Sequence, residues 1–264
     1  MRQCVTTPWA ATPRPPPGAS RVSIRWTGRW IHCRTTPRPR RPIPATAKYP
    51  RLPPWTSHDK GAPPWGSQPI WSRADDLAFK AAILEALPAI SSVWPHVTSM
   101  LRHYLGNTGN TVNLDPAELM TEIPEFNDEV NRTIHNQVAE IVAQAVASGN
   151  YGKPTPFGTG WLGFYPSPTK YPDWFRAIGG FDYSVGGVVT VYPPSTPGGN
   201  PIVHVESQVD IADRYKWDTG KESKIGPLTI EDGDIQALQT AGLAREFNIE
   251  GHHLMPTFQG EFIV

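Results

Sequence analysis

The sequence predicts an α+β fold in which N-terminal helices pack on a mainly antiparallel β-sheet or half-barrel, preceded by a disordered segment rich in proline and arginine. Three observations lead to this prediction. Residues 75–147 place apolar side chains at helical spacing, residues 181–217 alternate as strands do, and residues 1–74 contain few aliphatic side chains. We therefore divide the chain into a disordered segment, 1–74, and an α+β domain, 75–264.

Composition separates the two parts sharply. Residues 1–74 contain 13 basic residues and one acidic residue, whereas residues 75–264 contain 11 basic and 23 acidic residues. The first part also holds 15 of the 30 prolines but only seven Leu, Ile, Val and Phe residues, too few to offset the entropy lost on ordering. Both cysteines lie there as well, which excludes a disulfide framework or a cysteine nucleophile in the domain.

Several interpretations of residues 1–74 stay open. Binding to nucleic acid or to an anionic membrane is compatible with the pairs Arg25-Trp26 and Arg29-Trp30. The run from Pro37 to Pro44 is compatible with a ligand for a proline-binding module. We favour a third interpretation, translation from a wrong frame or from a start placed too far upstream. No apolar core follows Arg2 and no run of 18 apolar residues occurs, so we expect neither a secretory signal nor a transmembrane helix.

The domain is expected to begin with helices. Leu77 to Ile90 has helical spacing, with Asp75 or Asp76 as its cap and Pro88 disturbing its end. A second helix is expected to follow Pro95 and to end at Gly106. A short third helix is expected to begin at Asp115-Pro116, because the first turn of a helix tolerates a proline without an N–H. The clearest helix runs from Glu125 to Ala147, and its apolar stripe consists of Val130, Ile134, Val138, Ile141, Val142, Ala145 and Val146.

Strand patterns dominate after residue 150. Residues 151–176 are rich in Gly, Pro and aromatic residues, and residues 181–192 predict a hairpin that bends near Gly186-Gly187. Residues 202–211 alternate as a strand that continues through Tyr215-Lys216-Trp217. A short helix over 232–244 and one strand with a loose end over 247–264 complete the expected order.

The densest polar cluster lies at 210–218. The domain has no P-loop, dinucleotide-binding glycine motif, Gly-x-Ser-x-Gly elbow or HExxH motif, and its histidines lack metal-ligand spacing. In an extended chain Asp213, Tyr215 and Trp217 share one face, and Arg214, Lys216 and Asp218 share the other. An acid, a phenol and cations at a strand end suit phosphate-ester chemistry, although an edge strand with solvated charges shows the same pattern. Four of the 11 basic residues of the domain fall within residues 214–224, which favours an anionic ligand: Arg214, Lys216, Lys221 and Lys224.

Several segments resemble the C-terminal activity domain of colicin M and its relatives, the bacteriocins that degrade lipid II. His103-Tyr104-Leu105-Gly106-Asn107, followed by Thr111-Val112-Asn113-Leu114, is similar to a His-Tyr-Leu-x-Gly-Asn-Gly … Ser-Val-Asn-Ile stretch of that family. Residues 136–149 resemble its long helix, Asp213 to Asp218 resembles its Asp-Lys-Tyr-Asp-Phe-Asn core, and residues 238–247 resemble the helix that follows. Order and spacing agree over about residues 95–250.

The resemblance implies an antibacterial, Mg²⁺-dependent phosphodiesterase that cuts lipid II between lipid and pyrophosphate at the outer face of the cytoplasmic membrane. It implies lipid II as the substrate and an immunity protein as a partner, and we expect no nucleic acid partner for 75–264. Asp213 matches the acid that the family needs most and would hold the metal. If the domain is such an enzyme, we expect Asp213, Tyr215 and Asp218 to be catalytic, and Arg214, Lys216, Trp217 and Lys221 to bind the substrate.

Two departures from the family pattern keep a second hypothesis open. Lys216 stands where the family has its second acid, which removes a metal ligand and inverts the local charge. The family's His-Arg pair is replaced by Thr219 to Lys224, so His204 or His252 would have to approach from elsewhere. Asp218 would replace the lost acid only through a bulge. The alternative function is therefore an inactive binding or structural module on the same fold.

Overall fold

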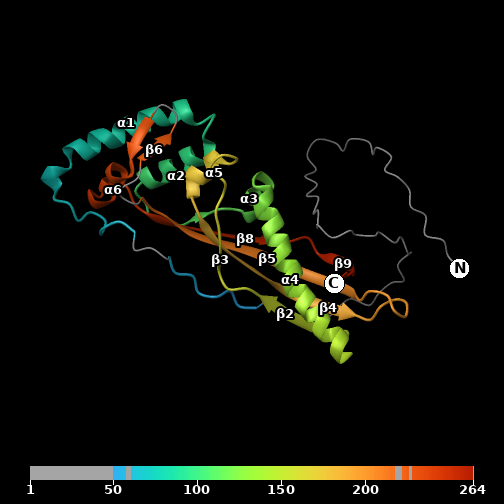
Figure 1. Cartoon of the computed structure of the whole chain (residues 1–264). Helices are drawn as coiled ribbons and strands as arrows, with labels where there is room; N and C mark the ends of the chain where they lie inside the picture. The colour runs from blue at the N-terminus through green and yellow to red at the C-terminus, as the bar shows by residue number, and fades with distance from the viewer. Residues whose placement is uncertain (1–49, 58–60, 218–221, 226–227, 264) are drawn as a thin grey trace, which may run out of the picture.

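The structure is a computed structural model that describes residues 50–57, 61–217, 222–225 and 228–263, with only the backbone of 222–230 (Figure 1). The described residues form a 3₁₀ turn and six α-helices: η1 (Ile70–Ser72), α1 (Ala74–Ile90), α2 (Pro95–Leu105), α3 (Pro116–Glu122), α4 (Pro124–Ser148), α5 (Pro172–Ile178) and α6 (Asp232–Thr240). Residues 1–49, together with Asp218 and Lys221, lie outside the described residues.

Seven strands form one mixed, mainly antiparallel sheet, in the order β1-β8-β5-β4-β2. β3 also pairs with β4, β9 also pairs with β5, and only the short β1–β8 pairing is parallel. β6 and β7 form a separate hairpin. The strand bounds are β1 (Val112–Asn113), β2 (Pro154–Gly158), β3 (Leu162–Phe164), β4 (Phe181–Tyr192), β5 (Ile202–Tyr215), β6 (Glu222–Ile225), β7 (Leu228–Glu231), β8 (Phe247–Leu254) and β9 (Phe258–Glu261).

The α+β prediction is confirmed, and the helices follow the sequence pattern closely. α4 crosses one face of the sheet, with contacts to β2, β4 and β5 (Figure 1). Val130, Ile134, Val138 and Val142 of its stripe are buried, and Gly149 ends the helix with a φ of 70°. Asp115 caps α3 as its position suggests, because its carboxylate accepts the Ala117 N–H at 2.9 Å. The cap predicted for α1 is wrong, since Asp75 and Asp76 lie inside its first turn.

The hairpin predicted at 181–192 is also wrong. β4 runs unbroken from Phe181 to Tyr192 and pairs along its length with β5. Gly187 does not form a turn but allows neighbouring atoms to approach the β4 backbone closely. A Cβ atom at this position would lie 2.3 Å from the Glu206 carbonyl oxygen and 2.6 Å from the Phe157 ring. The sequence did not predict three further elements in and around the Gly/Pro-rich stretch: the strands β2 and β3, each of which pairs with β4, and helix α5.

The core lies between the sheet and the helices. Phe126 of α4 sits at its centre, with ring centroids 5.0 Å from Phe181 and 5.5 Å from Tyr183 of β4. A second aromatic group joins α2 to the end of β5, where Tyr104 is fully buried and its hydroxyl donates to the Ile235 carbonyl at 3.0 Å. Through Tyr104, this second group brings α2, α6 and the end of β5 into contact.

The prediction of disorder does not hold for residues 50–57 and 61–73, which we call the strap. The strap contacts the sheet on the face opposite α4, as follows from two neighbouring β4 residues. The Trp55 indole N–H donates to the Asp182 carboxylate at 2.8 Å, whereas the next residue, Tyr183, reaches α4 through Thr133. Further along, the Ala62 N–H donates to Glu246 at 2.7 Å and the Gly66 N–H to the Gln239 carbonyl at 3.0 Å. Indole and backbone donors, rather than aliphatic side chains, hold this segment in place.

Candidate active site at the end of β5

Asp213 lies two residues before the end of β5, on the face that points to the helices. The residues that share this face are Val203, Val205, Ser207, Val209, Ile211 and Tyr215, all of them buried. Asp213 is half-buried and is the one acid among them. Opposite it in the neighbouring strand β8 lies the apolar Ile249. A carboxylate is costly to desolvate, so an acid on a largely apolar face is a candidate for a functional role.

Tyr215 shares the face of Asp213 but belongs to the core. Its ring stacks on Phe247 with centroids 4.8 Å apart and planes at 11°, and it meets Trp217 edge-on at 6.1 Å. Burial raises the pKa of the Tyr215 phenol well above its ordinary value, and the negative charge of Asp232 adds to the shift. The phenol therefore stays protonated and packed, which makes it a positioning group for the strand end.

Arg214 points to the opposite face of the sheet. Its guanidinium donates to the same Glu246 oxygen through two nitrogens, at 3.2 Å and 3.0 Å. Glu246 is almost fully buried, and its other oxygen accepts the Ala62 N–H of the strap. Arg214 and Asp213 therefore do not face one another, and Arg214 serves the contact between the sheet and the strap.

Lys216 and Trp217 continue the chain beyond β5. Lys216 is half-buried, and Trp217 is buried with 8% of its surface exposed. The Trp217 carbonyl accepts the Gln236 side-chain N–H at 2.8 Å, which ties the strand end to α6. The structure thus makes Trp217 a packing residue.

A second acid near Tyr215 had not been singled out from the sequence. Asp232, the first residue of α6, is buried with 6% of its surface exposed, and its charge raises the pKa of Tyr215. In the sequence this aspartate looks like an ordinary acidic residue in the first turn of a helix. Only the folding of α6 back onto β5 reveals its proximity, because 17 positions of chain separate Asp232 from Tyr215.

The two histidines considered as replacements for the family's His-Arg pair lie on the other face. His252 in β8 forms a hydrogen bond through Nδ1 with the buried Asp210 carboxylate at 2.8 Å. Asp210 precedes Asp213 by three positions on β5, so the two side chains point to opposite faces of the sheet. His204 lies on the same face of β5 as Asp210, nearer the start of the strand. His103, in contrast, comes to the strand end from α2, where its ring meets Phe247 edge-on at 4.5 Å.

Two segments that carry the family resemblance therefore meet in space. His103-Tyr104 of α2 packs on the aromatic group that follows Asp213, with the Tyr104 and Tyr215 rings 5.7 Å apart. The chemistry of the nearby acids also suits Mg²⁺, which takes one or two carboxylates and completes its shell with water and phosphate oxygens. Asp213 precedes Tyr215 by two positions on the same strand face, and the charge of Asp232 acts on the Tyr215 phenol.

Comparison of the chain with family models, curated proteins and solved structures finds no match. Among the described residues, no helix is both long and apolar enough to span a membrane. The likeness to the colicin M activity domain thus rests on the ordered sequence segments.

Proposed function

We propose that the domain is an antibacterial phosphodiesterase that hydrolyses the bond between polyprenol and pyrophosphate in lipid II. The observation that carries this proposal is Asp213, the one acid on a largely apolar strand face, at the place where the two resembling segments come together.

Each nearby residue then has a distinct role. Asp213 takes part directly, as a base toward the attacking water or as an oxygen ligand, and Asp232 supplies the second carboxylate. Mg²⁺, held by these acids, would offset the charge of the pyrophosphate oxygens. Tyr215 and Tyr104 stay protonated because burial raises the pKa of both phenols, and they fix the strand end against α2. Lys216, which is half-buried just beyond β5, would contribute a cation toward the pyrophosphate oxygens.

A second candidate function is binding of a polyprenyl pyrophosphate without turnover. Three features favour it: Lys216 replaces the family's second acid, Tyr215 and Trp217 are buried, and His204 and His252 lie on the face opposite Asp213. The two functions share the site and differ only in hydrolysis, so one assay separates them.

The test is cleavage of lipid II by the full chain in the presence of Mg²⁺. The full chain is needed because the strap contacts the domain. We expect release of the pyrophosphoryl sugar-peptide, lost in Asp213→Asn and in Asp232→Asn. Glu206→Gln is the matched control, since it removes an exposed carboxylate from the other face of the same strand. Folded wild-type protein that binds lipid II without cleaving it would establish the binding module, and equal cleavage by Asp213→Asn would refute the assignment of the site.

A further inference from the structure

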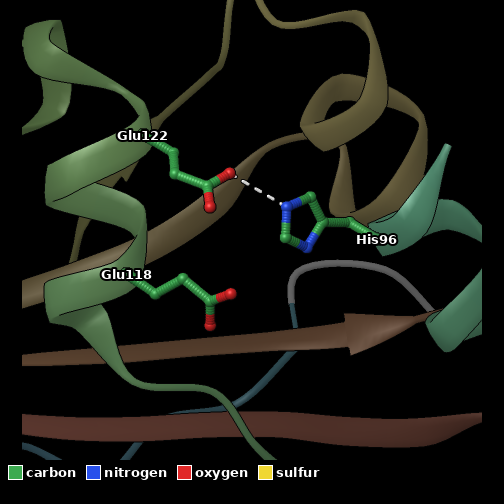
Figure 2. Close-up of side chains that lie close together, drawn as sticks. All are labelled: His96, Glu118 and Glu122. Atoms are coloured by element: carbon green, nitrogen blue, oxygen red, sulfur yellow. Dashed lines mark hydrogen bonds and ion pairs between the residues drawn. The ribbon is translucent and has the colours of Figure 1, made fainter. Parts of the chain in front are cut away.

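A second group of ionisable side chains lies where the start of α2 comes close to α3 (Figure 2). It consists of His96 at the start of α2 and of Glu118 and Glu122 on α3, and one ligand atom from each lies within 4.8 Å of the others. His96 Nε2 is 2.9 Å from a Glu122 carboxylate oxygen, and Glu118 points toward the same space from one turn earlier. We call these three residues the His–Glu–Glu group.

Surrounding residues hold the His–Glu–Glu group in its orientation. The His96 imidazole stacks on the Trp174 indole of α5, with ring centroids 3.6 Å apart and planes at 18°. The Trp174 N–H in turn donates to the Glu122 carboxylate at 2.8 Å. Asp173 accepts the backbone N–H groups of His96 and Val97, each at 3.0 Å, and so fixes the first turn of α2. Such outer contacts orient the ligands of metal sites.

The charge arrangement also favours a bound cation. Glu118 and Glu122 are four residues apart on one helix, and like charges at this spacing destabilise a helix. Both glutamates are exposed, so their carboxylates are open to an ion from solvent. A divalent ion between them would replace this repulsion with attraction.

The donor set points to a particular class of ion. One imidazole nitrogen with two carboxylates suits Zn²⁺ and similar transition metals, whereas Mg²⁺ prefers oxygen ligands alone. Ligands around a tetrahedral Zn²⁺ lie roughly 3.3 Å apart, as bond lengths of about 2.0–2.1 Å require. Because the three ligand atoms lie within 4.8 Å of one another and Glu118 is exposed, rotation of the Glu118 side chain would bring the set to that separation.

We propose that His96, Glu118 and Glu122 form a binding site for one divalent transition-metal ion of the Zn²⁺ class. The three protein ligands leave at least one coordination position for water. The site joins α2, α3 and, through Trp174, α5. It is independent of the proposed Mg²⁺ ligands at Asp213 and Asp232, because it differs from them in both residues and donor chemistry.

The test is Zn²⁺ binding by the full chain with Cys4 and Cys33 replaced by serine, followed by calorimetry and thermal unfolding. We expect one equivalent of Zn²⁺ per chain, a rise in Tm on binding, and no competition from excess Mg²⁺. Glu118→Gln, which alters only an exposed side chain, should weaken binding by at least about tenfold, and His96→Gln should abolish it. Co²⁺ should report the same site through its visible absorption.

The control is His253→Ala, because His253 is paired with Asp115 at 3.3 Å just before α3 and lies outside the group. It should leave the affinity unchanged. Zn²⁺ affinity that is equal in wild type and Glu118→Gln, or the absence of binding in the folded wild type, would overturn the proposal. The outcome is independent of lipid II cleavage, so either proposal can fail alone.

Discussion

The two faces of β5 use charged residues in opposite ways. On the strap side each described ion pair of the strand has an evident structural role: Arg214 bonds to Glu246, and Asp210 bonds to His252. On the helix side the strand is apolar except for Ser207 and Asp213. Charge on the strap side thus contributes to stability, whereas we propose a functional role for the acid on the helix side.

The largest expected effect on stability comes from adding one methyl group to the helix-side face. Gly187→Ala should lower the free energy of unfolding by about 2–3 kcal/mol, because the new Cβ would collide with the Glu206 carbonyl and the Phe157 ring. Urea denaturation measures the change. Gly160→Ala is the control, since a Cβ there meets nothing within 4 Å. A harmless Gly187→Ala would support the hairpin that the sequence alone suggests.

Removing the buried acid on the strap side should have the next largest effect. Glu246→Gln should cost roughly 2 kcal/mol, because it takes the negative charge from Arg214 while the carboxamide stays buried. The half-exposed Arg214 limits the loss. The same variant should also loosen the strap, detectable as faster hydrogen exchange at the Ala62 amide. Unchanged exchange at Ala62 together with full stability would show that the strap-side pairs contribute little.

A smaller effect is expected where the strap meets β4. Trp55→Phe keeps most of the aromatic surface but loses the indole N–H bond to Asp182, which should cost about 0.5–1 kcal/mol. Trp71→Phe provides the control, since Trp71 is 87% exposed. Equal stability of the two variants would mean that Trp55 does not anchor the strap.

The smallest effect concerns a surface group far from β5. Hydrogen bonds from Lys170 and Tyr171 lower the pKa of Glu125 to about 2. Because this folded-state pKa lies below the ordinary value, the stabilisation is present above about pH 4.5 and is lost as the pH falls toward 2. Lys170→Met should raise the Glu125 pKa in an NMR titration, with little change in stability at pH 7 because both groups are exposed. A Glu125 pKa near 4.5 in the wild type would contradict these contacts.

Local patterns predicted the helices well, and long-range packing determined what they missed. The stripe of α4 and the Asp115 cap depend on residues within one or two turns, so the sequence is sufficient for both. The sequence of the two glycines in β4 suggests a turn, because the close contacts of Phe157 and Glu206 with Gly187 arise only in the folded sheet. The strap was missed because indole N–H groups and backbone amides hold it, which a count of aliphatic residues does not register.

The candidate site shows the same division. The sequence placed Asp213 and Tyr215 on one face and Arg214 on the other, as alternation along a strand requires, and the structure confirms it. It did not predict that Tyr215 is buried or that Asp232 lies near it. It also gave no indication of the His–Glu–Glu group, whose members come together only when α2 packs beside α3.

The most direct test of the contrast between the two faces compares Asp213→Asn with Asp210→Asn in lipid II cleavage and urea denaturation. We predict that Asp213→Asn abolishes cleavage and costs less stability than Asp210→Asn, because Asp213 is half-buried whereas Asp210 is buried. Asp210→Asn should keep cleavage and cost about 1 kcal/mol, through loss of the charged bond to His252. Cleavage that survives in Asp213→Asn, or a loss of stability equal to that of Asp210→Asn, would contradict the account.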